Sequence, residues 1–242
     1  SYIYYNNFQK HWNQNKFLNY SKTLEQKIPE LVSTKFLNKS LQDNKKIKIG
    51  FFSSDIRGKH SVTYFLRTVL INYNNKKFEI NLYLNSKENE NDPTVKEFKK
   101  LVDKSVNVIN LNDAQLIDLI RKDQLNIIID LMGLTSQNRL AIFKNRVAPV
   151  QISWCGYNNT TGLNEIDYLI SDKNLIFKEE KNLYAEKILF MPKIWNCHSG
   201  FEYKKKNITP PIIKNKYITF GSFNNFSKIN DNVISVWVSI LN

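Results

Sequence analysis

The sequence predicts an α/β domain with a mostly parallel sheet that is covered by helices on both faces. From residue 46 onward, segments of strand character alternate with segments of helical spacing, an order that produces parallel β-α-β units. The segment "LNIIIDLMG" (125–133) is apolar through its middle, as strands buried on both faces are. The chain has 242 residues, of which 42% are hydrophobic, so it is long enough to bury a complete core.

The predicted elements follow one another at short spacing. Strands are expected at 46–52, 78–85, 106–111, 125–133, 149–156, 166–172 and 187–192. Helices are expected at 61–73, 92–103, 113–123 and 136–146, where apolar residues recur every three or four positions. Asp92 followed by Pro93 is a typical helix start, and Asp113 is placed to cap the third of these helices.

The flanks of this alternating region have other patterns, so we divide the chain into three parts. Residues 1–45 form a helical segment with aromatic residues at helical spacing, interrupted at Pro29 and ending in a linker at 41–46. Residues 46–206 form the α/β lobe. Residues 207–242 begin with a connection made rigid by two prolines, followed by a strand and turn at 217–229 and a helix at 230–242. That helix shows no stop signal, which predicts a sequence cut from a longer chain.

Composition narrows the classes of partner. The formal net charge is +13, but lysines are spread along the chain and only five residues are arginine, the residue suited to forked phosphate and base contacts. We therefore expect no nucleic-acid partner. No stretch of about 18 apolar residues exists, so no membrane span is expected. Cys155 and Cys197 are the only cysteines and form no metal-ligand motif, which predicts a reducing intracellular setting and no metal site.

Polar residues concentrate in three loops: "SSDIRGKHS" after the first predicted strand, "GLTSQNR" after the fourth and "GYNNTTG" after the fifth. Ligands of open parallel sheets bind at the carboxyl ends of the strands, so these loops predict the binding face. Asp55 and His60 in the first loop allow two interpretations. They perform acid-base chemistry or contact a substrate hydroxyl or phosphate, or else Asp55 closes the turn and His60 caps the following helix.

The remaining polar candidates also allow two interpretations each. The turn at 156–162 either holds a sugar or phosphate through amides and hydroxyls or is a plain turn. Lys228, just ahead of a helix, either meets a phosphate or is solvated. Asp123, Asp130 and Asp167 lie beside apolar strands and are expected to be caps or loop anchors. No Gly-x-Gly-x-x-Gly follows the first strand, which counts against a nicotinamide enzyme.

Three stretches together resemble a known family. They are "IGFFSSDIRGKHSVTYFL" (49–66), "IIIDLMGLTSQNRLAIFKNRVAPVQISWCGYNNTTGLNEIDYLISD" (127–172) and "FGSFNNFSKI" (220–229). Together they resemble the catalytic region of protein O-GlcNAc transferases and SPINDLY-type proteins, which form glycosyltransferase family 41. The resemblance extends over most of residues 8–242, with the stretches in the same order. The resemblance implies a GT-B fold of two Rossmann-like halves with the donor between them. Residues 46–206 would be the N-terminal half, and 207–242 a linker and the truncated start of the C-terminal, nucleotide-binding half.

The resemblance also implies an activity: inverting, metal-independent transfer of a sugar from a nucleotide to a Ser or Thr hydroxyl of a protein. UDP-GlcNAc is the usual donor, and the SPINDLY branch uses GDP-fucose. The implied partners are a nucleotide sugar, a protein acceptor and the missing C-terminal lobe of the same chain. Tetratricopeptide repeats upstream and a cytoplasmic location are further implications. Because most of the second half is absent from the sequence, the 242 residues alone are expected to be inactive.

The resemblance assigns roles to single residues. Asp55 and His60 would lie near the reacting centre, with Asp55 as a proton acceptor or relay, and Lys228 would offset charge on the leaving diphosphate. The family often has Gly-Tyr-Pro where this chain has Gly-Tyr-Asn. The residues expected to bind the donor are Gly156, Tyr157, Asn158 and Asn225. Two alternatives stay open: another GT-B transferase acting on small molecules or lipid carriers, and a non-catalytic Rossmann-like binding module.

Overall fold

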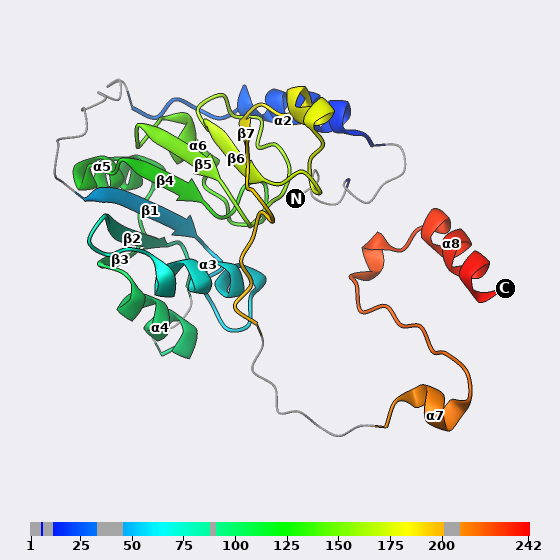
Figure 1. Ribbon diagram of the computed structural model, residues 1–242. Helices are drawn as coiled ribbons and strands as arrows, with labels where there is room; N and C mark the ends of the chain where they lie inside the picture. Colours follow the sequence, from blue (N-terminus) through cyan, green and yellow to red (C-terminus); the bar gives the residue numbers. More distant parts are fainter. Residues whose placement is uncertain (1–5, 7–11, 33–45, 88–90, 201–208) are drawn as a thin grey trace.

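The computed structural model describes residue 6 and residues 12–32, 46–87, 91–200 and 209–242. Its centre is a seven-stranded sheet in which all neighbouring strands run parallel, in the order β3-β2-β1-β4-β5-β6-β7 (Figure 1). The predicted fold class is confirmed. The strands are β1 (Ile47–Ser53), β2 (Phe78–Leu84), β3 (Lys104–Asn107), β4 (Ile127–Asp130), β5 (Val150–Ser153), β6 (Tyr168–Ser171) and β7 (Lys187–Phe190).

The middle strands are buried on both faces. Phe51 and Phe52 of β1 are adjacent in sequence, point to opposite faces and are both buried, each in a different core cluster. The prediction for the third strand was displaced, because β3 ends at Asn107 and not at residue 111. The N–H of Leu111 bonds back to the carbonyl of Val108, and this turn takes the chain away from the sheet.

Helices cover both faces of the sheet (Figure 1). On one face, α3 (Ser61–Asn72) and α4 (Pro93–Leu101) pack on the strands through fully buried side chains such as Leu66 and Phe98. On the other, α5 (Asp113–Asp123) and α6 (Leu140–Lys144) contribute Ile120 and Phe143 to the second cluster. This arrangement leaves the two ends of the sheet to the loops.

Two details of the predicted helices were wrong. The cap of α5 is Asn112 and not Asp113: the Asn112 side chain accepts the N–H of Gln115, whose side chain accepts the N–H of Asn112 in return. The helix expected at 136–146 is reduced to the five residues of α6. Gln137 and Arg146 have positive φ angles of 61° and 45°, and this left-handed backbone cannot belong to an α-helix.

The described part of the N-terminal segment packs on the lobe. Its helix, α2 (Gln14–Glu25), places Glu25 in an ion pair with Lys144 of α6. Beyond the helix, Asn145 Oδ1 accepts the N–H groups of Leu31 and Val32 at 2.7 and 3.2 Å. The predicted helical character is therefore confirmed for residues 14–25, while most of the linker expected at 41–46 lies outside the described residues.

The last described stretch, residues 209–242, contains α7 (Pro211–Asn215), the short 3₁₀ helix η2 (Phe226–Lys228) and α8 (Asp231–Leu241). The helix expected at 230–242 is confirmed, with Asn230 as its cap. The strand expected from residue 217 is absent from this stretch. Tyr217, Ile218 and Phe220 are exposed there, and a strand forms only where a neighbouring strand pairs with it.

Candidate active site

The loops after β1 and β4 begin where the strand order of the sheet reverses. From β1 the chain continues outward to β2 and β3, and it then returns to place β4 on the other side of β1. Ligands of open α/β sheets bind at such a crossover, beyond the carboxyl ends of the strands. The loop at 54–60 starts at this crossover, directly beyond the carboxyl end of β1.

Asp55 is held in a tight turn directly after β1. Its N–H donates to Ser53 Oγ at 2.9 Å, and its carbonyl accepts the N–H of Arg57 at 3.0 Å. Its carboxylate lies 3.5 Å from Arg57 Nη2 and 3.7 Å from His60 Nε2, and the side chain is 14% exposed. The fold thus gathers a carboxylate, a guanidinium and an imidazole in one turn.

His60 has the capping role that was one of its two interpretations. It is the N-cap of α3, and its Nδ1 accepts the N–H of Val62 at 3.4 Å. A neutral imidazole that accepts at Nδ1 carries its proton on Nε2, the atom that faces Asp55. The separation of 3.7 Å is too long for a hydrogen bond, so Asp55 and His60 are neighbours whose polar atoms face each other.

The other end of the same turn is anchored to α4. The N–H of Gly58 donates to Asp92 Oδ2 at 3.2 Å, and Thr94 Oγ1 donates to the carbonyl of Gly58 at 3.1 Å. Asp92 Oδ1 also caps α4 through the N–H of Thr94 at 2.7 Å. Gly58 has a φ of +39°, a region that favours glycine. The turn is therefore fixed at two points.

The aspartates beside the strands are anchors, as expected. Asp130, at the end of β4, accepts the N–H groups of Met132 and Gly133 at 3.0 and 2.8 Å. Complete burial raises the pKa of Asp130 to about 6, although these two N–H groups lower it. Asp123 accepts hydrogen bonds from Lys104 and Tyr83. Asp167 accepts hydrogen bonds from Arg146 through both carboxylate oxygens.

The turn after β5 touches the loop after β4. A Cβ on Gly156 would lie 1.8 Å from the carbonyl oxygen of Leu131, so only glycine fits there. Tyr157 is buried, and its Cβ packs against Gly133. Asn158 is exposed. Of the three residues expected at the sugar, Gly156 and Asn158 are at least partly accessible, while the Tyr157 ring belongs to the core.

The second half of this turn is fastened by a buried carboxylate. Glu186 accepts the N–H of Thr161 at 2.7 Å and the hydroxyls of Thr160 and Thr161. Burial raises the pKa of Glu186, and the three donors oppose that effect. From the other side, Gln14 Nε2 of α2 donates to Asn159 Oδ1 at 2.6 Å. The turn at 156–162 is thus held by hydrogen bonds from two sides, with Glu186 directly before β7 and with Gln14 of α2.

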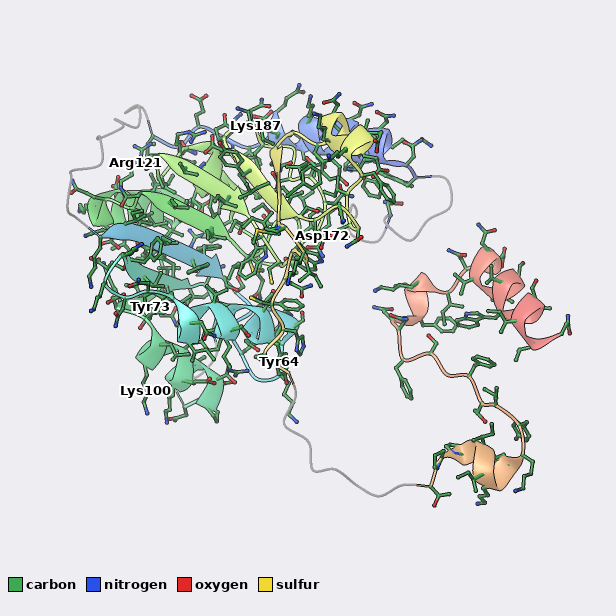
Figure 2. The ribbon with its side chains drawn as sticks, viewed as in Figure 1. Tyr64, Tyr73, Lys100, Arg121, Asp172 and Lys187 are labelled. Atoms are coloured by element: carbon green, nitrogen blue, oxygen red, sulfur yellow. The ribbon has the colours of Figure 1, made fainter. Side chains whose placement is uncertain are left out.

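His198, a residue to which the sequence assigns no role, lies against α3. The His198 ring stacks on Tyr64, one helical turn beyond His60, with 5.0 Å between ring centroids. The segment that leads to His198 is held by Asp172, directly after β6, which accepts the N–H of Trp195 at 2.8 Å. Tyr64 and Asp172 are labelled in Figure 2. Asp172, directly after "YLIS", is the one sign of this arrangement in the sequence, because an aspartate at the end of a strand often fixes the following loop through hydrogen bonds.

Asn225 and Lys228 lie in η2 and are not brought to the other candidates. Asn225 Oδ1 accepts the N–H and the hydroxyl of Ser227, so this residue caps the short helix. Lys228 is the last residue of η2 and is exposed. Both belong to the stretch 209–242, which lies apart from the sheet (Figure 1).

The described residues bear on two expectations from composition, that there is no metal site and no membrane span. Across the part of the chain that the structure describes, no three His, Cys, Asp or Glu residues are grouped to hold a metal ion. Among the same residues, the helices are too short or too polar to cross a membrane. Both cysteines are free thiols, with Cys155 buried and Cys197 half-buried.

Comparison with known proteins identifies relatives over most of the chain. A protein from Arabidopsis thaliana named as a probable UDP-N-acetylglucosamine–peptide N-acetylglucosaminyltransferase SPINDLY is 32% identical over 199 residues, covering 81% of this chain and 21% of the relative. A protein of the same name from Oryza sativa subsp. japonica is 33% identical over 208 residues, covering 82% and 22%. The chain thus spans about a fifth of the length of these curated relatives.

A solved structure supports the fold. A mutant O-GlcNAc transferase from Thermobaculum terrenum matches 97% of this chain and 44% of its own with a TM-score of 0.80, at 24% sequence identity. The family model described as Glycosyl transferase family 41 matches residues 22–208, a region that contains the turn with Asp55, the loop after β4 and the turn after β5. The chain therefore belongs to glycosyl transferase family 41.

Proposed function

We propose that this chain carries one wall of the active site of an enzyme that transfers N-acetylglucosamine from UDP-GlcNAc to Ser or Thr hydroxyls of proteins. The observation that carries the proposal is the turn with Asp55 and His60 at the strand crossover. The proposed donor and acceptor classes are supported by family membership and by the names of the relatives, which specify UDP-N-acetylglucosamine and a peptide. The donor of this protein is proposed as UDP-GlcNAc, with GDP-fucose as the alternative to be tested.

The proposed reaction is a single displacement. The acceptor oxygen forms a bond to the anomeric carbon, the bond from that carbon to the diphosphate oxygen breaks, and the configuration inverts. The acceptor proton passes to Asp55, because His60 uses Nδ1 for the helix cap and offers a proton at Nε2. The bonding electron pair leaves with UDP, whose charge Lys228 offsets.

The remaining assignments complete this proposal. Gly156, Tyr157 and Asn158 lie next to the sugar, with Tyr157 contributing its backbone since its ring is buried. Asn225 binds the nucleotide. The reaction is proposed to need no metal ion, and the nucleotide site is completed by a C-terminal lobe. Two free thiols support a reducing compartment such as the cytoplasm.

The test measures transfer of labelled sugar to protein by the complete product of the gene. We expect transfer from UDP-GlcNAc that survives a metal chelator and that falls at least about 100-fold in the Asp55→Asn and His60→Ala variants. Lys228→Ala should lower the transfer rate, while Lys214→Ala, a loss of the same charge in the neighbouring helix α7, should leave it unchanged. The 242-residue chain alone should show almost no transfer.

Three results would contradict the proposal. Wild-type protein that transfers from neither nucleotide sugar would refute a sugar transferase acting on proteins. Transfer to lipid carriers or small molecules but not to protein would support the alternative acceptor class. Equal rates for Lys228→Ala and Lys214→Ala would remove Lys228 from the site.

A further inference from the structure

Asn85 joins the two loops that meet at the strand crossover. It follows the last residue of β2 and is only 4% exposed. Its Nδ2 donates to Ser54 Oγ at 3.0 Å and to the carbonyl oxygen of Gln137 at 3.1 Å. Ser54 Oγ in turn donates to the same carbonyl at 3.0 Å. The three groups form a closed triangle that links the ends of β1 and β2 to the loop after β4.

Gln137 has a backbone conformation that needs such support. Its φ of 61° is left-handed, which costs a residue other than glycine about 1–3 kcal/mol unless the surroundings compensate. Its carbonyl oxygen accepts two of the three hydrogen bonds of the triangle. Asn85 and Ser54 therefore hold a strained peptide in place, and strain of this kind is concentrated at functional sites.

The triangle also determines where Asp55 lies. Ser54 is the residue before Asp55, and its N–H faces Met132 Sδ at 3.1 Å while its hydroxyl belongs to the triangle. Ser54 is itself buried, so it has no freedom to move separately from these partners. A shift of the loop after β4 would thus be transmitted through Ser54 to the carboxylate of Asp55.

We propose that Asn85 is a positioning residue: by locking Ser54 to the loop after β4, it holds the Asp55 carboxylate where the acceptor hydroxyl gives up its proton. The inference rests on the proposed function, since it gives Asp55 that task. Asn85 is 4% exposed, which leaves it almost no surface for a contact with substrate. A displacement of about 1 Å in a reacting group is able to cost about 100-fold in rate, so a side chain outside the site controls the reaction through position alone.

The experiment compares Asn85→Ala with Asn81→Ala in the complete gene product. Asn81 lies within β2, four residues before Asn85, and is equally buried. Among the described residues no hydrogen bond joins it to Ser54 or Gln137, so its loss controls for removal of a buried amide. We expect Asn85→Ala to lower kcat at least about tenfold, with less than threefold change in the KM for UDP-GlcNAc. Amide hydrogen exchange at Asp55 and Gln137 should accelerate in this variant and not in Asn81→Ala.

A second variant keeps the inference testable if Asn85→Ala does not fold. Ser54→Ala removes the hydroxyl of the triangle, and it should lower kcat in the same way; the double variant should cost less than the sum, because both act on one network. A folded Asn85→Ala or Ser54→Ala protein with wild-type kcat and exchange would overturn the inference and leave the proposed function intact. Wild-type protein without transfer would refute the function, and the exchange rates would still decide whether Asn85 fixes the turn.

Discussion

Replacing Gly156 by alanine tests the contact between the turn after β5 and the loop after β4. The added Cβ would lie 1.8 Å from the carbonyl oxygen of Leu131 and 2.6 Å from its carbonyl carbon, and real Cβ contacts essentially never fall below 3.0 Å. Both atoms are backbone, so no rotamer change relieves the clash. Overpacking of a rigid interior typically costs about 1–3 kcal/mol, and we place Gly156→Ala at about 3 kcal/mol of unfolding free energy.

Urea unfolding of the 242-residue chain measures this loss. With a slope of about 2 kcal/mol per M, the midpoint for Gly156→Ala should fall by about 1.5 M. Gly50→Ala is the matched control, because its Cβ would meet only side-chain atoms, Leu125 Cδ1 at 2.5 Å and Tyr83 Cε2 at 3.1 Å. These side chains are able to move, so the control should lose about 1 kcal/mol. A Gly156→Ala protein no less stable than Gly50→Ala would refute the described contact.

Two further predictions concern the anchors around the site. Burial raises the folded-state pKa of Asp130 from 3.8 to about 6, so its charge destabilises the fold most fully above pH 6. Acidification from pH 6 to pH 4 should therefore stabilise wild type by about 2 kcal/mol relative to Asp130→Asn, and a constant difference between the two urea unfolding curves would contradict this. Asn145→Ala removes the acceptor for the N–H groups of Leu31 and Val32. Trypsin should therefore cleave at Lys27 about tenfold faster, while the free energy of global unfolding changes little. An unchanged cleavage rate would show that these hydrogen bonds do not hold the segment.

The order of the elements was predictable because hydrophobic spacing depends on local sequence. Six of the seven strands were located from apolar runs and the third was displaced, while α5 was predicted at 113–123 with its bounds correct. Its cap was wrong, because Asn112 and Asp113 are both good caps and only the side-chain geometry of the Gln115 capping box chooses between them. The shortness of α6 was equally hidden, since left-handed backbone at Gln137 and Arg146 gives no compositional signal.

The location of the candidate site was predictable, and its supporting contacts were not. Asp55 and His60 stand out because polar residues after an apolar strand are visible in the sequence. The contact of Asn85 with Gln137 joins residues 52 positions apart, and that of Glu186 with Thr161 joins residues 25 apart. Such pairs form only after the sheet order is fixed. Polar residues that follow an apolar strand are therefore visible in a single sequence, whereas the residues that hold them through long-range contacts are not.

Two helix caps make it possible to separate support of the turn at 55–60 from the overall stability of the fold. Asp92 caps α4 and also holds the N–H of Gly58, whereas Asn112 caps α5 on the opposite face of the sheet and touches no part of the turn at 55–60. Loss of either cap to alanine should cost about 1 kcal/mol of unfolding free energy. Only Asp92→Ala should also accelerate amide exchange at Gly58, because only that carboxylate bridges helix and turn. Equal exchange at Gly58 in the two variants would mean that Thr94 alone anchors the turn, and that Asp92 serves its helix and nothing else.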